Sequence, residues 1–496
     1  MSKYNAAGTG ITLLSEHVGA TAGCGEVNPV GASACNDDRA SASGIPPDGE
    51  GVSEKTRVLF FMTLGLVLIG IGFLFNTPQE VLAGNVTILT SPANLITDYM
   101  MLSNIGAAFV NVGVMLLISL FMVKANGGRL GGLYTAAIFT VAGFSFFGKN
   151  FFNSLPITLG VFLFAKIDKK PFRRYLPQAL FGTALGPLVS EICFNLGLPM
   201  MQGLLLSMAC GVAAGFIIPP LAMHFVKYHQ GFNLYNIGFT AGIIGMFFMA
   251  ALRGIGVDVA AVSIISSGNN AAFATILYSL FAVMLLLGLY LNGWSIRGYA
   301  RLIKESGRDC CDYTERYGFG LAMVNMALLG ILTTSYVLII GGQLNGPTIG
   351  GIFTVVGFGA TGKHVKNVLP IIIGVLLAKL INIYEHNSTA AILAALFGTT
   401  LAPIAGKYGF GCGIVAGLLH MAVTMNIGYL HGGMNLYNNG FSGGFIAAAM
   451  VPVIDSLKNS LSTGAKKPLI RKKAIFKRIP QASESPTSPM AEAAEA

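Results

Sequence analysis

Two short segments that contain glycine and lysine are the first candidates for binding chemistry in this chain. GFSFFGKN runs from Gly143 to Asn150, and GFGATGKH runs from Gly357 to His364. Glycines leave backbone N–H groups accessible, a following helix has an electropositive N-terminus, and lysine adds a full positive charge. Such segments favour an anion or an electron-rich polar solute, with Lys149 and Lys363 as binding residues.

Both segments fit G-x-x-x-x-G-K, the pattern of a phosphate-binding P-loop. A P-loop requires Ser or Thr after the lysine to hold Mg²⁺, whereas Asn150 and His364 follow it here. Each segment also lies inside an apolar stretch instead of following a soluble strand, and the sequence shows no separate nucleotide-binding domain. We therefore expect no ATP hydrolysis and, more generally, no enzyme.

The composition predicts an all-α polytopic membrane protein. Of the 496 residues, 53% are hydrophobic and only 10% are charged, whereas soluble domains carry about 25% charged residues. Apolar runs long enough to cross a bilayer recur along the chain. In the first half the segments are 57–76, 103–123, 131–147, 151–167, 176–196, 201–223 and 234–252. In the second half they are 272–292, 318–341, 346–361, 367–382, 389–405, 409–429 and 434–453.

The two sets of seven segments are copies of one unit. IFTVAGFSFFGKNFFNSLPITLGV, from Ile138, matches IFTVVGFGATGKHVKNVLPIIIGV, from Ile352. ALFGTALGP, from Ala179, matches ALFGTTLAP, from Ala395, and HQGFNLYNIGF, from His229, matches HGGMNLYNNGF, from His431. We predict membrane repeats over residues 57–255 and 271–457.

The basic residues predict that the two repeats have opposite orientations. With the N-terminus inside, most basic loop residues fall on the cytoplasmic side, as the positive-inside rule requires. These are Lys124, Arg129, Lys166, Lys169, Lys170, Arg173, Arg174, Lys227, Arg297, Arg301, Lys304, Arg308, Arg316, Lys407 and the basic tail. Arg253 and Lys379 fall outside. An odd number of crossings per unit inverts the second copy, which is the plan of many secondary transporters.

The third and fourth segments of each repeat are shorter than a full span. Short, interrupted segments at matching positions in two halves are a sequence pointer to a transporter's binding site. We interpret each pair as a re-entrant hairpin or as two tilted or broken spans. The prediction is about ten full spans plus two short helix pairs, with the glycine–lysine segments at the tips of the pairs.

The role of the tips has two open interpretations. An intramembrane lysine is a functional hypothesis by default, but the glycines could instead serve packing while the lysines extend to the interface. Asn153 and Asn367 lie one helical turn beyond each lysine. They could line a site or bond the carbonyl that the neighbouring proline leaves free.

The two NLYN motifs supply further candidate site residues, and these too have a structural and a solute-binding interpretation. Asn233 and Asn435 suit helix N-caps, and Tyr235 and Tyr437 suit an interfacial aromatic belt. Alternatively, these groups, together with Asn236 and Asn438, hydrogen-bond a solute at two mouths of a pathway. The candidate proton-coupling residues are His229, His431 and Glu191. We expect the two histidines to be loop residues at the membrane surface, and we expect the matched acids Asp98 and Asp312 to lie at the interface.

The ends of the chain and the cysteines point to no further site. Residues 1–53 and the low-complexity end of 464–496 are predicted to be disordered, and the basic part of the tail predicts a cytoplasmic anchor that faces anionic lipid. The seven cysteines show no metal-ligand spacing. We expect no metal, no cofactor and no nucleic-acid partner. Membrane lipids and a small solute are the expected partners, and a homo-oligomer remains open.

The paired blocks GFNLYNIGFTAG and GGMNLYNNGFSGG, with GKNFFNSLPI and GKHVKNVLPI, resemble an uncharacterised bacterial multi-pass membrane family that is known as a duplicated domain of unknown function. The resemblance covers roughly 57–457 and implies a location in the bacterial cytoplasmic membrane. It brings no known substrate or site residue.

Taken together, the sequence predicts a secondary transporter or channel for a small anionic or polar solute, with its site between the two repeats. Two alternatives remain. One is a membrane-embedded enzyme that acts on lipid, and the other is a non-transporting scaffold or sensor.

Overall fold

The computed structural model describes residues 51–259, 262–308, 311–378, 380–381 and 384–464. Both repeats up to Val451 belong to one compact unit, and the description below concerns that unit. The predictions for the two tails lie almost wholly outside the described residues, as do Lys379 and Cys310.

The first repeat is helical throughout apart from a two-residue strand. Its elements are α1 (Glu54–Phe75), α2 (Pro78–Thr90), β1 (Ile96–Thr97), α3 (Tyr99–Leu102), α4 (Ile105–Ala125), α5 (Gly132–Phe144), α6 (Phe151–Ile167), η3 (Phe172–Arg174), α7 (Leu176–Gly182), η4 (Thr183–Leu185), α8 (Gly186–Phe194), α9 (Met200–Tyr228) and α10 (Asn236–Gly254).

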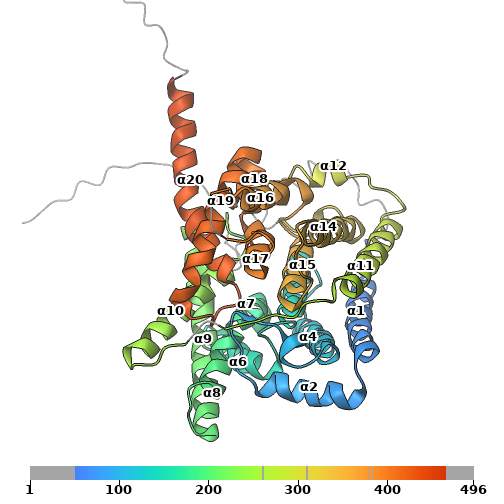
Figure 1. Cartoon of the computed structure of the whole chain (residues 1–496). Helices are drawn as coiled ribbons and strands as arrows, with labels where there is room; N and C mark the ends of the chain where they lie inside the picture. The colour runs from blue at the N-terminus through green and yellow to red at the C-terminus, as the bar shows by residue number, and fades with distance from the viewer. Residues whose placement is uncertain (1–50, 260–261, 309–310, 379, 382–383, 465–496) are drawn as a thin grey trace, which may run out of the picture. The chain divides into compact units, whose positions relative to one another are not determined.

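The second repeat has a similar series of helices (Figure 1), although its strand β2 precedes its first helix and α12 is much shorter than α2. Its elements are β2 (Ser263–Ile264), α11 (Asn270–Leu291), α12 (Tyr299–Leu302), α13 (Tyr313–Arg316), α14 (Phe319–Ile339), α15 (Gly346–Phe358), α16 (Val365–Ala378), α17 (Thr389–Gly398), η5 (Thr399–Leu401), α18 (Ala402–Tyr408), α19 (Phe410–Ile427), η6 (Gly428–His431) and α20 (Asn438–Gly464).

The predicted fold class is confirmed. Within the described residues, nine helical stretches are long and apolar enough to cross a membrane, and the stretch Thr389–Tyr408 is one of them. Its counterpart in the first repeat, formed by α7, η4 and α8, has the same helix–3-10–helix pattern as α17, η5 and α18, and the count of about ten spans stays a prediction. The four short apolar helices are α5, α6, α15 and α16, which are the two predicted short pairs.

In the first repeat, the start of α5 lies next to the segment that follows α6. Near the start of α5, the Tyr134 hydroxyl donates to the Arg173 carbonyl beyond the end of α6, at 3.0 Å. The tip between the helices reaches instead to the linker before α4, where Asp98 and Phe147 form an isolated β-bridge. Asp312 and Thr361 form the equivalent bridge in the second repeat.

Asp98 joins the repeats because it caps a helix of the other repeat. Its carboxylate accepts the backbone N–H of Gly346, at the start of α15, and that of Ser266, both at 3.1 Å. It also accepts the backbone N–H of Met100 at 2.9 Å. The side chain is 0% exposed. The expectation of an interfacial residue is wrong for Asp98, since these N–H groups replace water as its partners.

Asp312 makes the reciprocal contact. Its carboxylate accepts the N–H of Gly132, at the start of α5, at 2.7 Å, and that of Thr314 at 2.8 Å. The neighbouring Asp312 carboxylate, followed by burial, raises the pKa of Glu315. Negative groups therefore gather at a helix N-terminus, where the macrodipole favours them.

The caps hold α5 and α15 in close contact across the repeat boundary. A Cβ atom on Gly143 would lie 2.5 Å from the carbonyl oxygen of Gly350, so glycine is required for this approach. The equivalent rings Phe139 and Phe353 pack against each other with centroids 5.9 Å apart. The two short helices thus form the central crossing of the fold.

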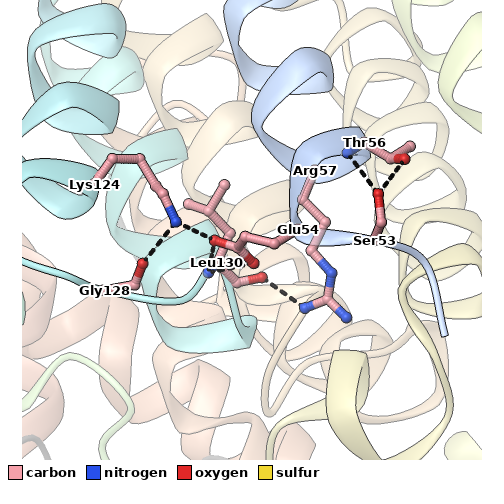
Figure 2. Close-up of polar contacts among 7 residues, drawn as sticks. All are labelled: Ser53, Glu54, Thr56, Arg57, Lys124, Gly128 and Leu130. Atoms are coloured by element: carbon pink, nitrogen blue, oxygen red, sulfur yellow. Dashed lines mark hydrogen bonds and ion pairs between the residues drawn. The ribbon is translucent and has the colours of Figure 1, made fainter.

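The start of α1 is fixed to the loop between α4 and α5 (Figure 2). Glu54 pairs with Lys124 at 2.7 Å and accepts the N–H of Leu130, while Arg57 donates to the Leu130 carbonyl at 2.8 Å. Ser53 caps α1 by accepting the N–H of Thr56. These contacts place the N-terminal end of α1 and the C-terminal end of α4 on one side of the molecule.

We predict that Asp98→Ala and Asp312→Ala each destabilise the protein, because each leaves the first N–H groups of a helix in the other repeat without an acceptor. Loss of a buried acceptor costs about 1–3 kcal/mol. Thermal unfolding in detergent should show a lower Tm for both variants than for Asp258→Ala, which removes an exposed carboxylate that pairs only with Arg253. Equal Tm values for all three would contradict the capping role.

Candidate functional site

An asparagine that the sequence did not single out as a site residue fixes each tip. The Asn111 side-chain amide in α4 donates to the carbonyls of Ser145 and Lys149, at 2.7 and 2.9 Å. Asn325 in α14 makes the same two bonds in the second repeat, each at 2.8 Å. The signal was present, because these asparagines occupy matched positions in both repeats and lie within apolar spans.

Asn153 and Asn367 complete the tips through hydrogen bonds to backbone groups of the same tip. Asn153 exchanges hydrogen bonds with the backbone of Asn150 and Gly148, both at 3.0 Å. Asn367 bonds to Gly362 and His364 in the same way, at 2.9 Å. These bonds close the tip locally and do not involve the carbonyl that the proline leaves free. That the two asparagines line a site stays a prediction.

The two lysines are buried, so the interpretation that they extend to the interface is wrong. Lys149 is 1% exposed and Lys363 is 0% exposed. The tips hold them inward because Asn111 and Asn325 bond the lysine carbonyls. The ammonium groups therefore lie inside the protein, where an uncompensated charge is costly.

Lys363 contacts the NLYN motif of the other repeat. Its ammonium donates to the Tyr235 hydroxyl at 2.5 Å and to the Thr399 hydroxyl, at the helix break in η5, at 2.7 Å. It also lies 4.4 Å from the centroid of the Tyr235 ring and 5.1 Å from that of Phe358. The site is thus shared between the repeats.

The NLYN motifs lie in the interior, and the interpretation of an interfacial belt is wrong. Tyr235 and Tyr437 are 2% and 1% exposed, and their rings meet with centroids 5.0 Å apart. Phe144 packs on Tyr437 at 4.6 Å, and Phe358 packs on Tyr235 at 4.9 Å. A row of four rings therefore connects the two tips, so the motifs do not form two separate mouths.

Asn233 and Asn435 exchange hydrogen bonds across the repeats instead of capping helices with their side chains. The Asn233 amide donates to the Gly440 carbonyl at 2.9 Å, and the Asn435 amide donates to the Gly238 carbonyl at 3.2 Å. Helix α10 begins after Tyr235, which makes no side-chain cap. These partners are about 200 residues apart in the chain, so local sequence could not reveal them.

The candidate coupling histidines are buried, and their expected place at the surface is wrong. His229 and His431 are each 0% exposed. Their Nε2 atoms bond to Asn236 and Asn438, at 2.9 and 3.0 Å. Each asparagine in turn donates to a carbonyl of the preceding long helix at 3.0 Å. The four side chains fix the turn that leads into each NLYN motif.

Glu191 is buried in α8. Its carboxylate accepts a hydrogen bond from Asn195 at 2.6 Å, and the side chain is 1% exposed. The matching position in the second repeat, Lys407, lies over the rings of Phe232 and Tyr408. Within the described residues no ion pair joins Glu191 to Lys149, and the coupling role of Glu191 stays a prediction.

Two cavities lie at the interface of the repeats. One, next to Tyr235 and Tyr437, has a volume of about 10 Å³, which is roughly the room that one water needs. The other, of about 590 Å³, lies between α1 and α11 and is lined mostly by apolar side chains such as Leu64, Leu277 and Phe353. The polar centre is closed, and the large space is apolar. Within the described ranges, no group of three or more His, Cys, Asp or Glu residues could hold a metal ion.

We predict that Asn111→Leu and Asn325→Leu each destabilise the protein by about 1–3 kcal/mol or more, since each leaves two buried carbonyls without a donor. Thermal unfolding should show this. Asn85→Leu is the matched control, because Asn85 bonds only to a carbonyl of its own helix. A loss of stability no larger than that of the control would contradict the role of Asn111 and Asn325 in fixing the tips.

The comparisons with known proteins agree with this architecture. The family model described as "Protein of unknown function (DUF1576)" matches the chain twice, over residues 77–254 and 291–456. Neither the curated proteins nor the solved structures yield a match to the chain. The two matched stretches fall within the two predicted repeats and cover more than half of the chain. The chain therefore belongs to the DUF1576 family, in which the domain of unknown function is present here in two copies.

Proposed function

We propose that this protein is a secondary transporter or channel for a small anionic or polar solute, and that the solute passes between the two repeats. The observation that carries the proposal is the shared site, in which a buried lysine of one repeat contacts the tyrosine of the other. Inverted-repeat transporters place their solute sites at such an interface, next to broken helices.

The chemistry of the interface supports an anion or a solute rich in acceptors. Lys149, Lys363 and the two tyrosine hydroxyls are buried together with the helix breaks at Thr183 and Thr399. No carboxylate within the described residues pairs with Lys149. The small central cavity suits a closed state, so passage requires the repeats or their side chains to move.

One observation favours a second candidate, a non-transporting scaffold or sensor. The centre is closed, and its cavity holds about one water. A scaffold, however, has no need for buried ammonium groups, which cost free energy in a bilayer. No observation favours an enzyme that acts on lipid.

The proposal extends to partners and place. We propose a multi-pass protein of the bacterial cytoplasmic membrane, with lipid along exposed apolar residues such as Leu66 and Val283 and with both termini cytoplasmic. Glu54 pairs with Lys124, and Arg308 donates to the Gln230 carbonyl at 3.0 Å. Each contact joins two regions predicted to be cytoplasmic, which supports their location on one side of the membrane. Arg253 contacts Tyr429, away from these regions.

We predict that the protein speeds entry of at least one of sodium formate, urea and glycerol into proteoliposomes. Vesicles are shrunk osmotically with each solute, and reswelling is followed by stopped-flow light scattering, with and without proton or sodium gradients. Lys149→Ala should slow the reswelling, whereas Lys227→Ala, which removes an exposed lysine at the end of α9, should not. Rates equal to those of protein-free vesicles under every gradient would favour the scaffold.

We also predict that reporters fused at two places report opposite sides of the membrane. Green fluorescent protein after Ala496 should fluoresce, because it folds in the cytoplasm. Alkaline phosphatase joined after Gly256, beyond α10, should be active, because it requires the outside. The reverse pair of results would invert the topology and place the basic loops outside, against the positive-inside rule.

A further inference from the structure

The two lysine–tyrosine sites are equivalent in sequence but differ in their hydrogen bonds. Lys363 donates to the hydroxyls of both Tyr235 and Thr399. Lys149 donates to the Leu180 carbonyl, at 3.3 Å, and no hydrogen bond joins it to Tyr437. The half of the interface around Lys363 is therefore closed by two side-chain hydrogen bonds. We call the half around Lys149 and Tyr437, which lacks such bonds, the open half.

The open half contains two hydroxyls without partners. Within the described residues, the Tyr437 and Thr140 side chains lie beside each other, and neither hydroxyl has a partner in regular hydrogen-bond geometry. Both side chains are at most 1% exposed. Thr354, the counterpart of Thr140, bonds to the Gly350 carbonyl at 2.9 Å. Of the matched pairs Tyr437/Tyr235 and Thr140/Thr354, the two hydroxyls without partners therefore both belong to the Lys149 half.

Several contacts place Tyr437 beside Thr140 and against the tip that carries Lys149. Tyr437 packs its ring against Phe144, in the last turn of α5, and Leu436 lies against Gly148, next to Lys149. Thr140 is one helical turn before Phe144 and thus on the same face of α5. The backbone also joins the halves here, because Leu436 donates to the Ala184 carbonyl at 3.0 Å.

The free atoms of the open half are mainly hydrogen-bond donors. A lysine ammonium carries three donors and no acceptor, and each hydroxyl carries one donor. A buried positive charge with one long bond to a neutral carbonyl is incompletely compensated. The complementary ligand is a small anion with more than one acceptor atom, because it could accept from the ammonium and from the hydroxyls together.

We propose that Lys149, Tyr437 and Thr140 form a binding site for a small monovalent oxyanion or carboxylate, and that Lys363, Tyr235 and Thr399 form the latch that holds the opposite half closed. The proposal rests on the proposed transport function for its biological role, but binding itself can be tested without flux. The cavity near Tyr437 is small, so side chains separate when the anion enters.

The test compares two substitutions that the duplication makes equivalent, Tyr437→Phe and Tyr235→Phe. Each removes one hydroxyl and keeps the ring. The full chain is purified, and its Tm is measured during titration with sodium formate or sodium nitrate against sodium gluconate at constant ionic strength. We expect at least one of the two anions to raise the Tm of the wild type, and Tyr437→Phe to weaken its apparent affinity about tenfold. Tyr235→Phe should change that affinity less than Tyr437→Phe does.

A second readout needs no ligand. Without added anion, Tyr235→Phe should lower the Tm, because the Lys363 ammonium loses an acceptor, whereas Tyr437→Phe should leave the Tm unchanged or higher. The proposal is overturned if neither anion stabilises the wild type, if both variants weaken binding equally, or if both lower the Tm equally. Anion binding that depends on Tyr437, with no flux in vesicles, would support the site and contradict transport.

Discussion

The structure depends on one reciprocal interaction, in which a carboxylate of each repeat accepts the first N–H groups of a short helix in the other repeat. Asp98 does this for α15, and Asp312 does it for α5. At the NLYN motifs, Asn233 and Asn435 repeat the principle, because each amide donates to a backbone carbonyl of the other repeat. Because each repeat leaves backbone groups that only its partner satisfies, the duplicated halves form one folding unit around the crossing of α5 and α15.

The same principle explains how non-helical backbone is tolerated inside a membrane protein. Irregular backbone at membrane depth requires protein partners for its N–H and C=O groups. The tips obtain them from asparagines: Asn111 and Asn325 bond the carbonyls from the side, while Asn153 and Asn367 close the turn from within. Once these groups are satisfied, the lysines at the tips are held inward.

The sequence predicted the features that depend on composition and repetition. Low charge and recurring apolar runs indicated the spans, and matched segments gave the duplication, the short pairs and the lysines. The depth of the NLYN motifs was predicted wrongly, because Tyr, Asn and His are all common at membrane interfaces and local sequence carries no information on depth. The bond between Asn233 and Gly440 spans 207 residues. The paired Asp98 and Asp312, and the paired Asn111 and Asn325, were visible as matches, but only the structure shows which repeat each one contacts.

The halves also differ behind the helix breaks, in a way that bears on which half can move. His420 in α19 packs against Gly398, just before Thr399, and lies in a buried polar cluster with Thr424, Asn439 and Ser442. In the first repeat the position of His420 is Ile218, which packs against Gly182, just before Thr183.

Hydrogen bonds are directional and fix one geometry, whereas apolar contact is non-directional and accepts small displacements. The break at Thr399, where Lys363 is bonded, is therefore supported by groups that resist movement. Behind the break at Thr183, the corresponding contact of Ile218 is apolar and yields more readily. If the protein transports as proposed, this divergence of the two copies favours the Lys149 half as the one that opens.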